Sequence, residues 1–209
     1  MNTLKILCLH GYGQTSAKFM HSFQGFWNRL RDLGCHLYFP EAIHSVSPFS
    51  GGEGKGWFTV SPNDKILGLQ ANDFFESKCY LGVDESVSNL EEFIENNGSF
   101  DGIIGYSQGG VMATILNGLN KISVKFMILV GIYPVTDEKL LDLKIYDNIE
   151  IPVLGIYGIK DDVVLSEYSK DAYLHIKNSE VHTHNGGHVI QYNKKLKIKY
   201  TEFLLRFKN

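Results

Sequence analysis

The sequence predicts an α/β protein in which a largely parallel sheet lies between layers of helices. The first observation is that short apolar runs alternate with longer segments whose apolar residues recur at helical spacing, the pattern of successive strand–helix–strand units. The second is that several runs are apolar at nearly every position, as expected for strands buried on both faces of a parallel sheet. The expected strands are residues 5–10, 36–39, the run leading into Ser107, 124–131, 151–158 and roughly 180–184.

Composition and charge favour a single domain that acts on a small molecule. The chain has 209 residues, of which 44% are hydrophobic and 12% aromatic. This is enough for one well-buried core and short for two, so we expect residues 1–209 to form one domain. The formal net charge of −3 is spread over the chain. This pattern gives no basic face for nucleic acid and favours a small neutral substrate.

Cysteine usage and the N-terminus favour a cytoplasmic location. The chain has three cysteines, and Cys8 lies inside an apolar run, as expected of a buried free thiol in a reducing compartment. Residues 1–10 are too short an apolar segment for a signal peptide or a membrane span. No other segment approaches about 18 consecutive apolar residues, so we expect no membrane span.

The first strand–helix–strand unit occupies the N-terminal fifth of the chain. The strand at 5–10 is followed by a helix that Thr15 or Ser16 can cap and that Gly34 ends. The strand at 36–39 completes the unit. The helix has its apolar positions at Phe19, Phe23, Phe26, Leu30 and Leu33.

Residues 41–80 show no clear periodicity. Prolines and glycines interrupt a mixed polar and aromatic stretch, and an irregular segment of this length in a compact domain is usually functional. We therefore expect it to form a wall or partial lid beside a substrate, with Trp57 and Phe58 lining the pocket. The alternative is that these two side chains only cover the edge of the core.

Helical patterns separate the remaining strands. A helix is expected from Asp84 to Gly98, and a second directly after Ser107, with apolar residues through Leu119. Two more are expected at 166–176 and 189–207. The strands and helices thus continue to alternate to the end of the chain.

The central motif is Gly105-Tyr106-Ser107-Gln108-Gly109, between an apolar strand and a helix. This is the layout of a nucleophile elbow, in which a serine on a strained turn projects its hydroxyl out of the sheet. The flanking glycines are needed where a Cβ would meet the neighbouring strand or helix. The alternative is an ordinary strand-to-helix turn with Ser107 as the helix N-cap.

A serine nucleophile needs a base, and the base needs an acid, both from loops at the carboxyl ends of strands. Asp161 and Asp162 directly follow the strand at 151–158, and Asp161 is our first choice for the acid. Asp137 is a further candidate, since it follows the strand that ends at Gly131. The alternative role for the Asp161–Asp162 pair is helix capping or a solvated turn.

Among the eight histidines, His188 is the best candidate for the base because it follows the last strand on a glycine-rich turn. His182 and His184 share one face of a strand, which suits a structural or surface role. A loop histidine is by itself more often a surface residue. A zinc site at these three histidines lacks a clear carboxylate or cysteine partner, so we expect no metal.

The order Ser107, Asp161, His188 along the chain is the triad order of α/β-hydrolases. Each member follows a separate strand, so all three are expected at one sheet edge. An oxyanion hole requires two backbone donors. We expect these to be the N–H groups of Gln108 and of Tyr12, in the loop after the first strand. The alternative is that Gly11 and Gly13 only make a tight turn.

Three segments resemble the FSH family of serine hydrolases: residues 9–15 (LHGYGQT), 100–110 (FDGIIGYSQGG) and 187–190 (GHVI). The resemblance covers most of the chain. It implies a compact α/β-hydrolase without a large cap domain, a three-layer sandwich with about six strands in the order 2-1-3-4-5-6. It also implies ester or thioester hydrolysis on Ser107, Asp161 and His188. Tyr106, Gly110 and Leu165 depart from residues that are more usual in the family.

The expected function is hydrolysis of a small carboxylic ester through an acyl-enzyme, without a cofactor. A thioesterase or lactonase using the same triad is one alternative. A non-catalytic protein of this fold that binds a small molecule is another, although no triad member is missing. The acyl length, the physiological substrate and the oligomeric state are not predicted by these patterns.

Overall fold

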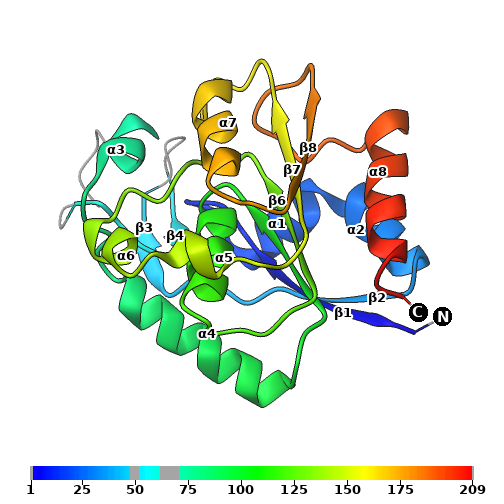
Figure 1. Cartoon of the computed structure of the whole chain (residues 1–209), viewed down its shortest axis with the longest axis horizontal. Helices are drawn as coiled ribbons and strands as arrows, with labels where there is room; N and C mark the ends of the chain where they lie inside the picture. Colours follow the sequence, from blue (N-terminus) through cyan, green and yellow to red (C-terminus); the bar gives the residue numbers. More distant parts are fainter. Residues whose placement is uncertain (1, 48–51, 62–70, 209) are drawn as a thin grey trace.

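The protein is described from a computed structural model covering residues 2–47, 52–61 and 71–208 (Figure 1). Its centre is a six-stranded sheet in which every neighbouring pair is parallel. The strands are β1 (Leu4–Leu9), β2 (Cys35–Tyr38), β5 (Gly102–Tyr106), β6 (Phe126–Val130), β7 (Val153–Gly158) and β8 (Ser179–His184). Their order is β2-β1-β5-β6-β7-β8. Counted along the chain as strands one to six, this is the predicted order 2-1-3-4-5-6, so the fold-class prediction is confirmed.

Helices cover both faces of the sheet and give three layers (Figure 1). One face is covered by α1 (Ser16–Ser22), α2 (Gln24–Asp32) and α8 (Lys194–Leu205). The other is covered mainly by α4 (Val83–Asn97), α5 (Gln108–Gly118) and α7 (Ser166–Leu174). Alternate residues of one strand enter different layers: Leu7 of β1 packs into one core and Ile6 into the other. This explains why the strands are apolar at nearly every position.

The predicted first helix is two helices, because the chain leaves helical geometry at Phe23, with φ −121° and ψ 29°. Thr15 caps α1 as expected, accepting a hydrogen bond from the Lys18 N–H. The break lets Trp27 of α2 turn back on α1, where its indole donates to the Phe19 carbonyl at 3.3 Å. Rings from both helices then pack together, which helical periodicity alone does not reveal.

The C-terminal helix begins later than predicted. Asn193 caps α8 by accepting the Leu196 N–H at 3.0 Å, so the helix starts at Lys194 and not at residue 189. Ile190, in the preceding segment, is buried in the same core as α8. Residues 189–193 are therefore a connection from the His188 turn to the helix.

The stretch 41–80 contains more regular structure than its sequence pattern indicates. Strands β3 (His44–Val46) and β4 (Gly54–Gly56) form an antiparallel hairpin, and α3 (Ala71–Glu76) follows. Residues 48–51 and 62–70 lie outside the described part of the chain. Two short helices between β6 and β7 were also not predicted: α6 (Glu138–Asp142) and the 3₁₀ helix η1 (Ile145–Asn148).

The three cysteines are unpaired: Cys8 and Cys35 are buried and Cys79 is exposed. In the described ranges no helix combines the length and apolar character needed to cross a membrane.

Candidate active site

Ser107 lies on a sharp turn between β5 and α5. Its φ of 53° and ψ of −126° are rare for a residue with a side chain and cost about 1–3 kcal/mol of backbone strain. A Cβ on Gly105 would lie 2.4 Å from the Gly110 Cα, and one on Gly109 would lie 2.3 Å from the Leu9 carbonyl oxygen. The two glycines of the motif are therefore required by close backbone contacts, as the nucleophile-elbow interpretation expects.

Ser107 occupies the N-cap position of α5, but its side chain makes no capping hydrogen bond. Its backbone N–H donates to the Val130 carbonyl at 2.9 Å. The turn is thus held by its backbone, and the hydroxyl is not used to cap the helix. The strained backbone and the absent cap bond favour the elbow over the ordinary capping turn.

Asp161 and His188 are directly hydrogen-bonded. Asp161 Oδ2 lies 2.7 Å from His188 Nδ1, and both side chains are largely buried, with 1% and 11% of their surfaces exposed. Asp161 Oδ1 accepts the backbone N–H groups of Val163 and Val164, each at 2.9 Å. A carboxylate accepts this hydrogen bond from Nδ1, so in the neutral imidazole Nε2 keeps a free lone pair. Nε2 is buried and has no hydrogen-bond partner in the described part of the chain.

Gly131 connects the serine turn to this pair. It follows Val130, which holds the Ser107 N–H, and it has a φ of 60°. A Cβ on Gly131 would lie 3.0 Å from His188 Cε1 and 3.7 Å from Asp161 Oδ2. Gly131 therefore allows the imidazole and carboxylate to approach the end of β6. Its role was not predicted, although its place at the end of an apolar run was visible in the sequence.

The loop after β1 lies against the serine. A Cβ on Gly11 would lie 3.2 Å from the Ser107 Cβ. Gln108 is the first residue of α5, so its N–H has no acceptor within the helix. The structure therefore brings the loop that carries the Tyr12 N–H and the start of α5 together beside Ser107. These are the two predicted sources of oxyanion donors.

His10 orients the peptide that contains the Tyr12 N–H. The Ala42 N–H donates to His10 Nε2 at 3.1 Å, so the ring proton is on Nδ1, which lies 2.9 Å from the Gly11 carbonyl oxygen. That carbonyl and the Tyr12 N–H belong to one planar peptide group. Burial lowers the pKa of His10, which keeps the ring neutral. His10 is the last residue of the strand predicted at 5–10, but this role was not predicted.

Trp57 and Phe58, the predicted pocket residues, are completely buried. The Trp57 N–H donates to the Gln108 side chain at 2.9 Å, and the Gln108 amide donates to the Phe58 carbonyl at 2.8 Å. The Trp57 indole donates to the His10 carbonyl at 2.8 Å. These bonds fix the residues against the elbow, so the structure places both side chains in the core instead of in the cavity beside Ser107.

A cavity of about 20 Å³ adjoins Ser107. Apart from Ser107 and Gln108, every lining residue is aromatic or aliphatic. The lining residues are Tyr12, Phe74, Phe75, Ser107, Gln108, Tyr133, Val163 and Val164. These come from the β1 loop, α3, the elbow and the segments after β6 and β7, so segments far apart in the sequence enclose the serine.

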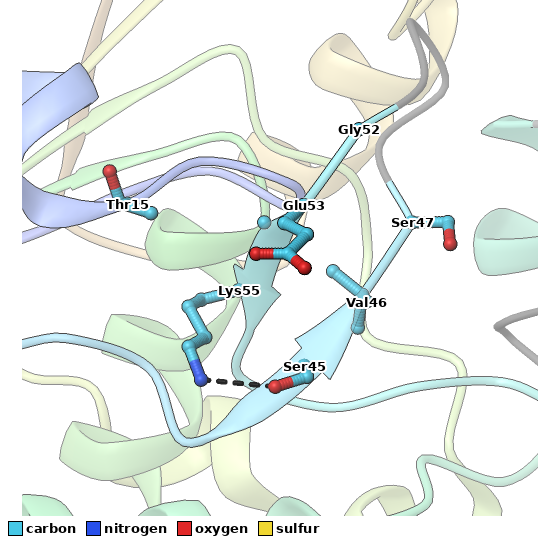
Figure 2. Close-up of a pocket in the computed structure, with 8 residues that line it drawn as sticks. Thr15, Ser45, Val46, Ser47, Gly52, Glu53 and Lys55 are labelled. Atoms are coloured by element: carbon cyan, nitrogen blue, oxygen red, sulfur yellow. Dashed lines mark hydrogen bonds between the residues drawn. The ribbon is translucent and has the colours of Figure 1, made fainter.

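A larger hollow of about 540 Å³ lies at the β3–β4 hairpin (Figure 2). Its lining includes Thr15, Glu53 and Lys55, and the Lys55 ammonium donates to the Ser45 hydroxyl at 3.1 Å. None of the predicted catalytic residues lines it. Although this hollow is larger than the cavity beside Ser107, its lining therefore does not indicate an active site.

The other carboxylates and histidines considered in the sequence have different surroundings. Asp137 is buried and caps α6, accepting the N–H groups of Tyr80 at 2.7 Å and Leu140 at 3.0 Å. Asp162 is exposed. His182 pairs with Glu180 at 2.9 Å. Across the part of the chain that the structure describes, no group of three or more histidine, cysteine or acidic side chains could hold a metal ion.

The parallel sheet, the strained serine turn and the buried histidine–aspartate pair at the same edge define the class: this is an α/β-hydrolase. Over residues 1–200 the chain matches the family described as Serine hydrolase (FSH1), and it belongs to that family. The resemblance seen in the sequence motifs is thereby confirmed.

Relatives agree with this assignment, and solved structures share the fold. Esterase OVCA2 of Danio rerio is 29% identical over 224 residues, covering 98% of this chain and 97% of that protein. Family of serine hydrolases 3 of Saccharomyces cerevisiae is 30% identical over 183 residues, covering 77% and 67%. The crystal structure of Arabidopsis thaliana SOBER1 has a TM-score of 0.67 at 21% identity and covers both chains completely. Zea mays acyl-protein thioesterase 2 has a TM-score of 0.66 at 17% identity, covering 100% and 95%.

Proposed function

We propose that the protein hydrolyses carboxylic esters through an acyl-enzyme formed on Ser107. The observation that carries the proposal is the 2.7 Å bond between His188 Nδ1 and Asp161. It leaves a buried Nε2 without a partner in the described residues, at the sheet edge where Ser107 lies. Such an imidazole is prepared to accept the proton of a serine hydroxyl.

In the first half of the reaction, Ser107 Oγ attacks the carbonyl carbon while His188 Nε2 takes the hydroxyl proton. Asp161 stabilises the imidazolium and holds the ring in the required tautomer. The carbonyl oxygen becomes an oxyanion held by the Tyr12 and Gln108 N–H groups. The carbon–oxygen bond to the alcohol then breaks, and the alcohol leaves with the proton from His188.

In the second half, water replaces the alcohol. His188 takes a proton from the water as its oxygen attacks the acyl carbon. The bond to Ser107 breaks, and His188 returns that proton to the serine oxygen. The carboxylic acid is released and the enzyme is regenerated without any group besides the protein and water.

Oxygen esters are the first choice of substrate because the relatives from Danio rerio and other animals carry the name esterase. A thioesterase would use the same steps. The ratio of kcat/KM on an oxygen ester and a thioester with the same acyl group separates the two activities. We expect the ratio, corrected for alkaline hydrolysis rates, to favour the oxygen ester. A ratio favouring the thioester would show that the protein is a thioesterase and would contradict the preference for oxygen esters.

The test is hydrolysis of p-nitrophenyl acetate by the wild type, Ser107→Ala and Ser88→Ala. Ser88 is an exposed residue of α4 and serves as the matched control. We expect Ser107→Ala to lose on the order of 10⁴-fold or more in kcat and Ser88→Ala to remain within twofold of the wild type. Substantial turnover by Ser107→Ala would overturn the proposal.

A further inference from the structure

We propose that the cavity beside Ser107 is an acyl subsite for a short acyl group bearing an oxygen acceptor, and that the Tyr133 hydroxyl donates a hydrogen bond to that oxygen. The matching substrates are esters of small alkoxy, hydroxy or oxo acids. The inference rests on the proposed function, because it assigns the acyl half of the same substrate.

The cavity is placed to hold the acyl group and not the alcohol. It adjoins Ser107 and Gln108, the proposed nucleophile and one oxyanion donor. His188, which must protonate the departing alcohol, is not among its lining residues. The part of the substrate that remains attached to Ser107 therefore enters this cavity, and the leaving group lies on the histidine side.

The size of the cavity limits the acyl chain. About 20 Å³ is slightly more than the space that one water-sized group requires. The ring centroid of Phe75 lies 4.8 Å from the ring centroid of Tyr133 and 4.6 Å from the ring centroid of Tyr168. On another side, the rings of Tyr12 and Phe74 are 4.7 Å apart. These aromatic walls leave room for only a short acyl group.

A tyrosine that lines the cavity has a hydroxyl without a hydrogen-bond acceptor in the described part of the chain. The Tyr133 hydroxyl is buried and has no hydrogen-bond partner among the described residues. An unsatisfied buried hydroxyl is unfavourable and rare in folded proteins. Burial raises the pKa of this phenol well above its usual value, so it is a neutral donor at physiological pH. A substrate oxygen in the cavity would satisfy it, whereas an alkyl chain of equal length would not.

The neighbouring tyrosine does not explain this hydroxyl. Tyr80 uses its own hydroxyl with Thr136, accepting the Thr136 N–H and pairing with its side-chain oxygen, both at 3.1 Å. Its ring stacks on Phe58 at 4.1 Å. Tyr80 is therefore part of the structural framework. Tyr133 lines the cavity, and its hydroxyl has no hydrogen-bond partner among the described residues.

The experiment compares two p-nitrophenyl esters of equal length, butyrate and methoxyacetate, which differ by one methylene replaced with oxygen. The quantity measured is the ratio of their kcat/KM values in the wild type and in Tyr133→Phe. Intrinsic reactivity cancels because both enzymes act on the same esters. We expect the methoxyacetate-to-butyrate ratio to fall about threefold to tenfold in Tyr133→Phe, with kcat/KM on butyrate within twofold. An unchanged ratio, or an equal loss on both esters, overturns the inference.

Two further measurements separate this role from a structural one. Because Tyr133→Phe removes an unsatisfied buried hydroxyl, we expect its thermal midpoint to be equal to or higher than that of the wild type. A lower midpoint would show that the hydroxyl has a structural partner. Wild type should prefer acetate over octanoate by at least about tenfold in kcat/KM, and Phe75→Ala should reduce that preference by opening the wall. A wild-type preference for octanoate contradicts the size limit.

Failure of this inference and failure of the proposed function give different results. If the wild type hydrolyses neither ester and no fluorophosphonate reacts with Ser107, the proposed function fails. If both esters are hydrolysed and Ser107 is labelled but the ratio is insensitive to Tyr133, only the acyl subsite is wrong.

Discussion

The hydroxyl of Tyr106 donates a 2.8 Å hydrogen bond to the backbone carbonyl of His188, 82 residues away in the chain. The two rings also lie against each other, with centroids 4.9 Å apart. Since Tyr106 immediately precedes Ser107, this contact fixes the histidine turn relative to the serine turn. Burial raises the pKa of the Tyr106 phenol, so the hydroxyl stays protonated and donates throughout the physiological range.

Tyr106→Phe keeps the ring and removes only this hydrogen bond. We expect kcat on p-nitrophenyl acetate to fall about threefold to tenfold with little change in KM, because the imidazole is less firmly positioned while the acyl cavity is intact. Tyr38→Phe, on β2 away from the site, is the control and should keep wild-type kcat. An unchanged kcat in Tyr106→Phe would show that the bond does not position His188.

The assignment of the acid predicts different effects at adjacent positions. Asp161→Asn should lower kcat about 10³- to 10⁴-fold, because an amide cannot stabilise the imidazolium and favours the wrong tautomer. Asp162→Asn should remain within twofold, since Asp162 is exposed. Steady-state kinetics of the two variants on one ester checks this. The reverse order of effects would transfer the acid role to Asp162.

His10→Asn tests the orientation of the proposed oxyanion donor at Tyr12. The bond from His10 Nδ1 to the Gly11 carbonyl and the bond that Nε2 accepts from Ala42 both hold this loop. Asparagine cannot make both, so we expect kcat to fall about tenfold while KM changes less than threefold, as for a group that acts in the transition state. A rise in KM with unchanged kcat would indicate a role in substrate binding instead.

Buried histidines predict that acid destabilises the fold. Burial lowers the pKa values of His10 and His184 below the usual 6.5, so below about pH 6.5 the unfolded chain binds more protons than the native protein. The free energy of unfolding is therefore highest above that pH and decreases as the pH falls toward the native pKa values, by at most about 1.4 kcal/mol per pH unit for each histidine.

Urea unfolding at pH 7.5 and pH 5.5 measures this difference. His10→Asn should show a smaller loss between the two pH values than the wild type, whatever its stability at pH 7.5. An equal loss in both proteins would mean that His10 does not contribute to the acid sensitivity.

Much of the fold follows from local patterns, because strands buried on both faces are apolar throughout and the helices between them are amphipathic. Ser107, Asp161 and His188 could be selected because the ends of parallel strands share one edge. The break at Phe23 and the burial of Trp57 depend on contacts between distant segments: Trp27 with Phe19, and Trp57 with His10. The contacts of Tyr106 and Gly131 with the His188 turn likewise exist only once the sheet brings these segments together.

The central claim is that Ser107 is the nucleophile, and covalent labelling tests it most directly. The protein is treated with a fluorophosphonate, and the modified residue is located by mass spectrometry of its peptides. We predict one adduct per chain, on Ser107, and no labelling of Ser107→Ala under the same conditions. An adduct on another residue, or labelling of Ser107→Ala at the wild-type rate, would contradict the mechanism.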